Sequence, residues 1–201
     1  QDHLFRLILA RQTTIGCWRD DCQLQHFCDR CPSLKSPSGP PSQASYAASI
    51  NPANFFSSFE DWHLAANEVV VIGLGNPGTD FENTPHNIGY ATVDRLVESF
   101  SLTWTKSPSL WGAQTLINDR PVVIFKMLVA IYYSGATLKI ISEHLSFSAK
   151  QIVLVYDDLS LPLGTFKTRA SGGAGGHRGV ASVLEAFQSD ISRSVKIGVN
   201  T

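Results

Sequence analysis

Three polar residues lie where strands of a sheet would end, and their types suit hydrolytic chemistry. Asn76 follows an apolar run at residues 69–72, His86 comes ten residues later, and Asp157 directly follows the apolar run 153–156. A histidine can take a proton from water when a carboxylate fixes its tautomer. The structural alternatives are that His86 caps a helix and Asp157 caps a strand. We expect the two to meet, because parallel strands end at the same sheet edge.

A glycine-rich loop is the second feature that could bind a ligand. Residues 171–179 precede a predicted helix, and glycines let backbone N–H groups approach an anion closely. Nearby positive residues outnumber the acidic Glu185 and Asp190; they are Lys167, Arg169, Arg178, Arg193 and Lys196. A flexible loop without a ligand is the structural alternative. The local charge suits a phosphate-bearing partner.

The elements that must position these residues follow from hydrophobic patterning. Continuous apolar runs predict buried strands at residues 69–72 and 151–156. Apolar residues at helical spacing predict helices at residues 88–100, 133–145 and 180–187. Shorter strands are predicted at residues 112–117, 121–125, 165–168 and 194–199. Strands that alternate with helices indicate an α/β sheet, with the site beyond the carboxyl ends of its strands.

The loop after the first strand has the letters of a dinucleotide-binding motif without its context. Gly73-Leu74-Gly75-Asn76-Pro77-Gly78 matches G-x-G-x-x-G. In dinucleotide-binding folds the third glycine lies inside a helix, whereas here Pro77 precedes that glycine and Pro85 follows it. Asp94 lies at about the distance of a ribose-binding acid, but inside the helical pattern. We therefore expect no dinucleotide cofactor.

Composition indicates an ordinary globular chain. The 201 residues are 43% hydrophobic and 16% charged, with 16 Lys and Arg against 17 Asp and Glu and a formal net charge of −1. No apolar run approaches the roughly 20 residues that span a bilayer, so we expect no membrane partner. The near-zero charge also argues against indiscriminate nucleic-acid binding, which needs a strong basic excess.

The first third of the chain differs from the rest. Residues 1–65 contain a proline- and serine-rich stretch and all the cysteines: Cys17, Cys22, Cys28 and Cys31. We interpret them as a low-order extension and linker, and residues 66–201 as the globular domain. Two alternatives stay open for the extension. The cysteines could bind zinc, although their spacing is tighter than two separated pairs, and the arginine-containing apolar start could belong to a mitochondrial transit peptide.

Three segments, in this order, resemble the signatures of the bacterial-type peptidyl-tRNA hydrolase family, over roughly residues 68–199. Residues 73–78 and Thr84-Pro85-His86-Asn87-Ile88-Gly89 are similar to G-L-x-N-P-G and T-R-H-N-x-G. Tyr156-Asp157-Asp158-Leu159 through Gly164 is similar to H-D-[DE]-L-x-L-P-x-G. Gly175-Gly176-His177-Arg178-Gly179 is similar to G-G-H-N-G. The ordered combination is far more specific than any one segment.

The resemblance implies a three-layer α/β fold, with a mixed, mostly parallel sheet flanked by helices. It also implies hydrolysis of the ester between a peptide and the terminal ribose of a tRNA. His86 stands at the position of the general base that activates water, and Asp157 at that of its orienting carboxylate. The implied substrate contacts are Asn76, Tyr132, His177 and Arg178, and the implied tRNA-phosphate contacts are Lys167, Arg169 and Lys196. Such a reaction requires neither a metal nor a cofactor.

The chain departs from the family pattern at two substrate-contacting positions and at its end. Tyr132 and Arg178 each replace an asparagine of the family. The family also continues through a further strand, a lid-like loop and a helix, so we expect a truncated member. The alternative function is a non-catalytic RNA- or tRNA-binding member, or a decayed copy. We expect a monomer whose partner is peptidyl-tRNA, and two compartments stay open, cytoplasm and mitochondrion.

Overall fold

A single sheet organises the molecule. The structure, a computed structural model, describes residues 41–188 and 193–200, and the four cysteines, with the zinc and transit-peptide interpretations, lie outside these ranges. The strands are β1 (Val69–Gly73), β2 (Thr105–Lys106), β3 (Leu110–Ile117), β4 (Arg120–Met127), β5 (Ile152–Pro162), β6 (Phe166–Arg169) and β7 (Ser194–Asn200). They lie in the order β2-β3-β4-β1-β5-β7-β6.

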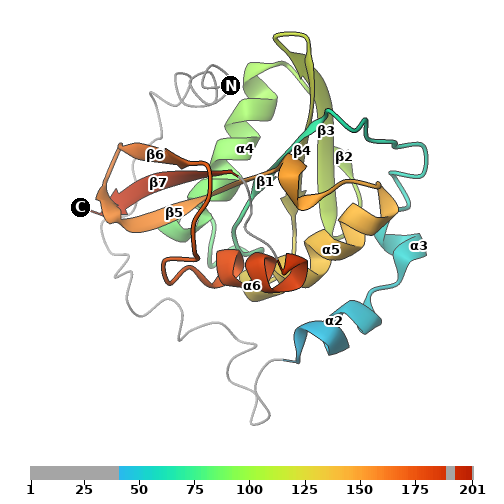
Figure 1. Cartoon of the computed structure of the whole chain (residues 1–201), viewed down its shortest axis with the longest axis horizontal. Helices are drawn as coiled ribbons and strands as arrows, with labels where there is room; N and C mark the ends of the chain where they lie inside the picture. Colours follow the sequence, from blue (N-terminus) through green and yellow to red (C-terminus); the bar gives the residue numbers. More distant parts are fainter. Residues whose placement is uncertain (1–40, 189–192, 201) are drawn as a thin grey trace.

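The four central strands, β4, β1, β5 and β7, are parallel to one another. Antiparallel strands flank them on both sides, β3 and β2 beside β4, and β6 beside β7. The predicted mixed sheet is therefore confirmed. Because the parallel strands share one direction, the loops that follow β1, β4 and β5 leave the same edge of the sheet (Figure 1).

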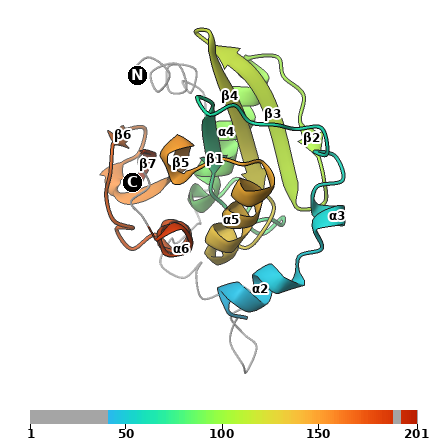
Figure 2. The same cartoon turned by 45° about the vertical axis from the view of Figure 1, so that its right-hand side comes forward.

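Helices cover both faces of the sheet and complete three layers (Figures 1 and 2). They are α2 (Gln43–Ser49), α3 (Pro52–Phe55), α4 (Ile88–Ser99), α5 (Ser134–His144) and α6 (Arg178–Phe187), with short 3-10 turns η4 (Pro85–Asn87), η5 (Ile131–Tyr133) and η6 (Ala149–Gln151). Helix α4 packs on one face, whereas α5 and α6 pack on the other. None of the helices within residues 41–188 is long and apolar enough to cross a membrane.

The all-apolar sequence of β1 reflects this double cover. Val70 and Ile72 belong to the core cluster under α5 and α6, whereas Val69 and Val71 belong to the cluster under α4. Alternate residues of a strand point to opposite faces, so a central strand between two helical layers needs apolar side chains at every position. All five residues of β1 are buried.

Helix α4 starts unusually close to the sheet. A side chain on Gly89 would collide with the backbone carbonyls of Leu74 and Val155. A glycine at this position lets the start of α4 rest against the carboxyl ends of β1 and β5. This contact fixes η4, and with it His86, above those two strands.

The packed part of the molecule begins earlier than the predicted boundary at residue 65. Residues 43–49 form α2 and residues 52–55 form α3, and Phe55, Phe56 and Phe59 are at most 5% exposed in the core cluster that also holds α5. The sequence-based assignment of this stretch to a low-order linker is therefore corrected. The proline- and serine-rich composition of this part of the chain predicted a linker. The three phenylalanines are nevertheless buried, because they pack against α5 and the sheet.

Strand β5 is longer than predicted. It was expected at residues 151–156, but it continues to Pro162, so Asp157 lies inside the strand rather than after it. Beyond Gly73, β1 has ended, and β5 pairs with β7 alone, Asp157 opposite Ile197 and Asp158 opposite Gly198. Residues 157–162 therefore have one neighbouring strand, and a strand with one neighbour tolerates polar residues. This is why the sequence of these residues lacks the continuous apolar run of a buried strand.

Candidate active site

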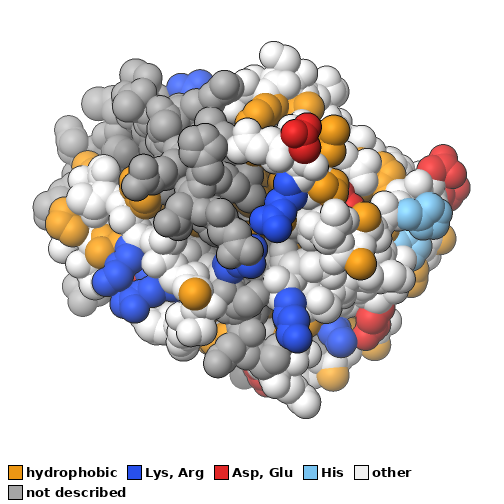
Figure 3. Space-filling model, turned by 45° about the horizontal axis from the view of Figure 1, so that its top comes forward, with side chains coloured by type: hydrophobic (Ala, Val, Ile, Leu, Met, Phe, Trp, Pro, Cys, Tyr) orange, Lys and Arg blue, Asp and Glu red, His pale blue; other side chains and the backbone are white. Residues whose placement is uncertain are grey.

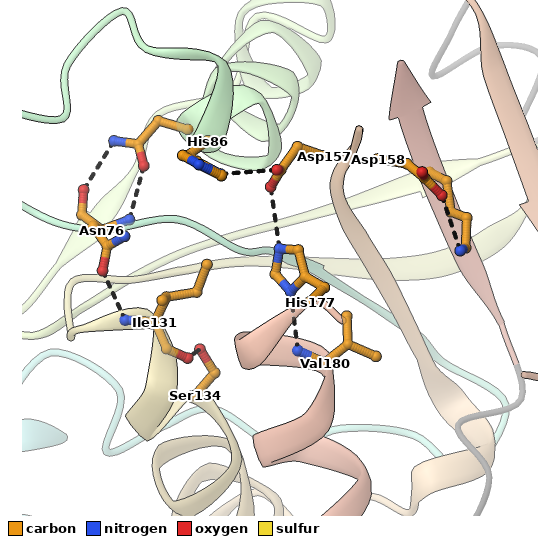
Figure 4. A network of polar contacts seen from close by, with 10 residues as sticks. Asn76, His86, Ile131, Ser134, Asp157, Asp158, His177 and Val180 are labelled. Atoms are coloured by element: carbon orange, nitrogen blue, oxygen red, sulfur yellow. Dashed lines mark hydrogen bonds and ion pairs between the residues drawn. The ribbon is translucent and has the colours of Figure 1, made fainter. Parts of the chain in front are cut away.

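The loops at the carboxyl edge of the sheet bring together residues from four separate segments (Figure 4). Asn76 comes from the loop after β1, His86 from η4, Asp157 from β5 and His177 from the start of α6. Figure 4 shows two neighbouring hydrogen-bonded groups: His86, Asp157 and His177 form one, and Asn76 with Ile131 forms the other. The polar residues that the sequence places at strand ends therefore share one site.

The predicted contact between His86 and Asp157 is present. Nδ1 of His86 lies 2.9 Å from Oδ2 of Asp157. An ionised carboxylate only accepts hydrogen bonds, so Nδ1 carries the hydrogen, and Nε2 of the neutral ring is left as the basic nitrogen. The side chain of Asp157 is 3% exposed and that of His86 is 24% exposed. The carboxylate is thus fixed inside the protein, while the histidine reaches the surface.

His177 contacts the other oxygen of the same carboxylate. Its Nε2 lies 3.1 Å from Oδ1 of Asp157, and its Nδ1 accepts a hydrogen bond from the backbone N–H of Val180, which caps α6. The resemblance assigned His177 to substrate binding, but both of its ring nitrogens are used within the protein. The position of His177 indicates that it holds the Asp157 carboxylate in place, at the oxygen that His86 does not contact.

These two histidines set the charge of Asp157. Burial alone would raise the pKa of this carboxyl group, but the hydrogen bonds from His177 and His86 outweigh burial and lower the pKa to about 2. Asp157 is therefore negative at neutral pH. A buried negative charge beside His86 stabilises the protonated form of the ring once it has taken a proton.

Asn76 is held by backbone and side-chain contacts on two sides. Its side-chain Oδ1 accepts a hydrogen bond from the N–H of Ile131, at 2.9 Å, in the turn η5. Asn87 fixes the backbone of Asn76 twice: its Oδ1 accepts from the Asn76 N–H and its Nδ2 donates to the Asn76 carbonyl. The bond at Oδ1 fixes the orientation of the amide, and the NH₂ group of Asn76 is its donor end.

Two of these partners, Asn87 and Ile131, were not predicted from the sequence. Asn87 stands next to His86 in the quoted motif, so an asparagine at a helix start was a signal that could have been used. Ile131 contributes only its backbone N–H, which no pattern of residue types reveals.

The two residues that depart from the family pattern lie at the rim of this group. Tyr132 belongs to η5, is half-buried, and packs edge-on against Tyr133 with ring centroids 4.5 Å apart. Arg178 is the first residue of α6 and is exposed. Each follows directly after a residue that contacts the site, Ile131 and His177 respectively.

The predicted phosphate contacts lie beside the site on β6 and β7. Lys167 and Arg169 are exposed, and Lys167 stands opposite Lys196 in the strand register. Nζ of Lys196 forms an ion pair with Oδ2 of Asp158 at 3.0 Å and lies 5.7 Å from the centre of the Tyr156 ring. That ring in turn contacts His177, which links the basic strands to the site.

Basic side chains of the described residues lie in several groups on the face shown in Figure 3. Among residues 41–188 and 193–200, no group of three or more His, Cys, Asp or Glu residues could hold a metal ion.

Comparison with known proteins identifies the family. A sequence model described as peptidyl-tRNA hydrolase matches residues 70–201. A peptidyl-tRNA hydrolase of Clostridium novyi is 32% identical over 132 residues, which cover 65% of this chain and 70% of that protein. One of Fervidobacterium nodosum is 35% identical over 131 residues, which cover 65% of this chain and 67% of that protein.

A solved structure shares the fold. The crystal structure of peptidyl-tRNA hydrolase from Acinetobacter baumannii matches with a TM-score of 0.63 and 23% identity, over 68% of this chain and 70% of that chain. The matched family segment includes every site residue named above, from Asn76 to Lys196. The sequence resemblance is confirmed, and this chain belongs to the peptidyl-tRNA hydrolase family.

Proposed function

We propose that this chain hydrolyses the ester between a peptide and the terminal ribose of tRNA, with water activated by His86. The observation that carries the proposal is the contact between Nδ1 of His86 and the buried carboxylate of Asp157, at 2.9 Å. The relatives named above are peptidyl-tRNA hydrolases. An ester is hydrolysed by an activated water, and a neutral histidine is suited to activate it.

The proposed reaction follows from the tautomer of His86. Nε2 takes a proton from water as the water oxygen attacks the ester carbonyl carbon, which produces a tetrahedral intermediate and a protonated ring. The bond from carbon to the ribose oxygen then breaks, and the ring returns its proton to that oxygen. Asp157 stays ionised throughout, because its pKa of about 2 lies far below neutral pH.

We assign Asn76 to orienting the substrate. The hydrogen bond from Ile131 fixes the orientation of its side-chain amide, so that its NH₂ group is the donor presented to the substrate near the ester. Lys167, Arg169 and Lys196 would contact tRNA phosphates, because positive side chains beside the site suit the backbone of a nucleic acid.

A second candidate function is binding of tRNA without hydrolysis. It is favoured by Tyr132, whose ring stands where the family has the smaller asparagine, and by the added charge of Arg178. Both functions use the same basic residues, so affinity for tRNA does not separate them. Release of the peptide does.

The test is release of the acyl group from an N-blocked aminoacyl-tRNA by the chain, by His86→Ala and by His63→Ala. His63 is exposed and outside the site, so it serves as the matched control. We expect wild type and His63→Ala to release the acyl group at similar rates, and His86→Ala to be at least about 10³-fold slower. Equal rates for wild type and His86→Ala would contradict the proposed chemistry. Absence of release from wild type, with tRNA still bound, would favour the second candidate.

A further inference from the structure

The segment before β1 packs against the elements that build the site, although it precedes the part of the chain that matches the family. The family match begins at residue 70, whereas α2 and α3 lie at residues 43–55. The ring of Tyr46 stacks on Tyr133 with centroids 3.9 Å apart, and the Tyr133 hydroxyl donates to the carbonyl of Pro41. Phe56 stacks on His144 with centroids 3.8 Å apart. Figure 2 shows α2 beside α5.

Gln43, the first residue of α2, makes three polar contacts with the elements that build the site. Its Nε2 donates to the carbonyl of Tyr132 at 2.9 Å and to Oγ of Ser182 at 2.7 Å. Its Oε1 accepts from the N–H of Ala136 at 3.1 Å. A glutamine amide has two hydrogens and a carbonyl oxygen, so these contacts use both kinds of group.

The contacts of Gln43 meet where α5 crosses α6. A side chain on Gly135 would collide with the backbone of Ser182, so the two helices touch at this point. Oγ of Ser182 also accepts a hydrogen bond from the N–H of Gly135 at 2.8 Å. Gln43 therefore binds η5, α5 and α6 at their common junction.

This junction supports the site from both sides. Ile131, next to Tyr132 in η5, donates the hydrogen bond that orients Asn76. Helix α6 begins after His177, which holds the Asp157 carboxylate. A shift of η5 would move the partner of Asn76, and a shift of α6 would move the partner of Asp157.

We propose that Gln43 is a positioning residue for this site: it fixes the turn η5, and through Ile131 the orientation of Asn76. The expected effect of Gln43 on the reaction rate rests on the proposed function. Its expected effect on the position of η5 rests on the hydrogen-bond geometry alone. The segment at residues 41–59 then contributes to substrate positioning as well as to the core.

The test compares Gln43→Glu and Gln43→Met with Ser49→Ala. Gln43→Glu keeps the length and an acceptor for Ala136 but removes the hydrogens donated to Tyr132. Gln43→Met keeps the size and removes all these polar contacts. Ser49 lies on the same helix, is exposed, and bonds only locally to the carbonyl of Tyr46 in the described contacts, so its loss should leave η5 unchanged. The measurements are amide hydrogen exchange by NMR, kcat and KM for the N-blocked aminoacyl-tRNA, and Tm.

We expect the amide of Ile131 to exchange about 5-fold faster in both Gln43 variants, the effect of losing one ordinary hydrogen bond. We expect kcat to fall by about the same factor with KM nearly unchanged, because orientation of a bound substrate affects the chemical step. Val71, in the central strand, should keep its exchange rate, and Ser49→Ala should match wild type.

Unchanged exchange at Ile131 in both Gln43 variants would overturn the proposal. Faster exchange at Val71 as well would also overturn it, because the effect would then be a general loss of stability. If wild type releases no acyl group, the proposed function fails, but the exchange rates still decide whether Gln43 positions η5.

Discussion

The candidate site and the basic strand beside it hold their polar side chains in opposite ways. The side chain of Asp157 is 3% exposed and accepts from two histidines, whereas Lys167 and Arg169 are exposed on β6. A carboxylate that orients a proton-transferring histidine needs a fixed position and partners that set its charge. A charge that binds phosphate from solution must be accessible when the nucleic acid arrives. Under the proposed function, the buried group serves the chemistry and the exposed charges serve the affinity for tRNA.

Asp157→Asn gives the largest effect expected from this comparison. An asparagine side chain has one accepting oxygen, so it cannot accept from both His86 and His177, and one ring must change its tautomer or lose its partner. We expect kcat/KM for the N-blocked aminoacyl-tRNA to fall about 10²-fold, with tRNA affinity nearly unchanged. Asp158→Asn is the matched comparison. It frees Lys196 from its ion pair, so it should alter KM and leave kcat within about twofold. A similar loss of kcat in both variants would remove the distinction between the two regions.

Low pH should reduce the contribution of Asp157 to the stability of the fold. Folding lowers the pKa of Asp157 from 3.8 to about 2. Its ionised form therefore stabilises the fold above about pH 4, and this contribution is lost as pH falls from about 4 to about 2. We expect a loss of about 2 kcal/mol in the free energy of unfolding over that range, measured by urea denaturation. Asp157→Asn should lack this part of the pH dependence. An identical pH dependence in the variant would contradict the assignment.

Loss of the exposed charges should affect binding of tRNA rather than the chemical step. We expect Lys167→Ala combined with Arg169→Ala to weaken tRNA binding about 10-fold and to reduce the slope of log affinity against log salt by about 2. The rate at saturating substrate should stay the same. Lys106→Ala is the control, because β2 lies at the opposite edge of the sheet. A fall in kcat without a change in affinity would place these residues with the site.

Tyr132→Asn gives the smallest expected effect. It replaces a large ring at the rim of the site by the residue that the family has there, while the backbone carbonyl bound by Gln43 is retained. We expect kcat/KM to rise by about threefold, roughly 0.7 kcal/mol, because the added amide can donate to the substrate. Tyr132→Phe keeps the ring and should bring no gain. An equal gain in both variants would show that loss of the hydroxyl, and not the added amide, caused the gain.

Residue patterns predicted the parts of the fold that hydrophobic periodicity determines. The apolar run of β1 and the helical spacing of α4 reflect burial on both faces of the sheet. The meeting of His86 and Asp157 followed from the common edge of parallel strands. The order of the motifs predicted the family, which is confirmed, and it suggested roles for single residues that stay predictions.

Other parts of the site depend on contacts that residue types do not encode. The N–H of Ile131 is a backbone group, and its role depends on where η5 lies. The second contact of Asp157, with His177, depends on how α6 approaches β5. Phe55, Phe56 and Phe59 lie in a segment of linker-like composition, so their burial could be seen only once α5 was in place.

The outer side of β6, which has no neighbouring strand among the described residues, affects the behaviour of the protein in solution. In the described part of the chain β6 ends the sheet, and its Phe166 side chain is 49% exposed. An unpaired strand edge can add a strand from a second molecule and so begin aggregation. Lys167 and Arg169 oppose this self-association, because two such edges would bring like charges together. The residues proposed to attract tRNA would thus also keep the protein soluble while no tRNA is bound.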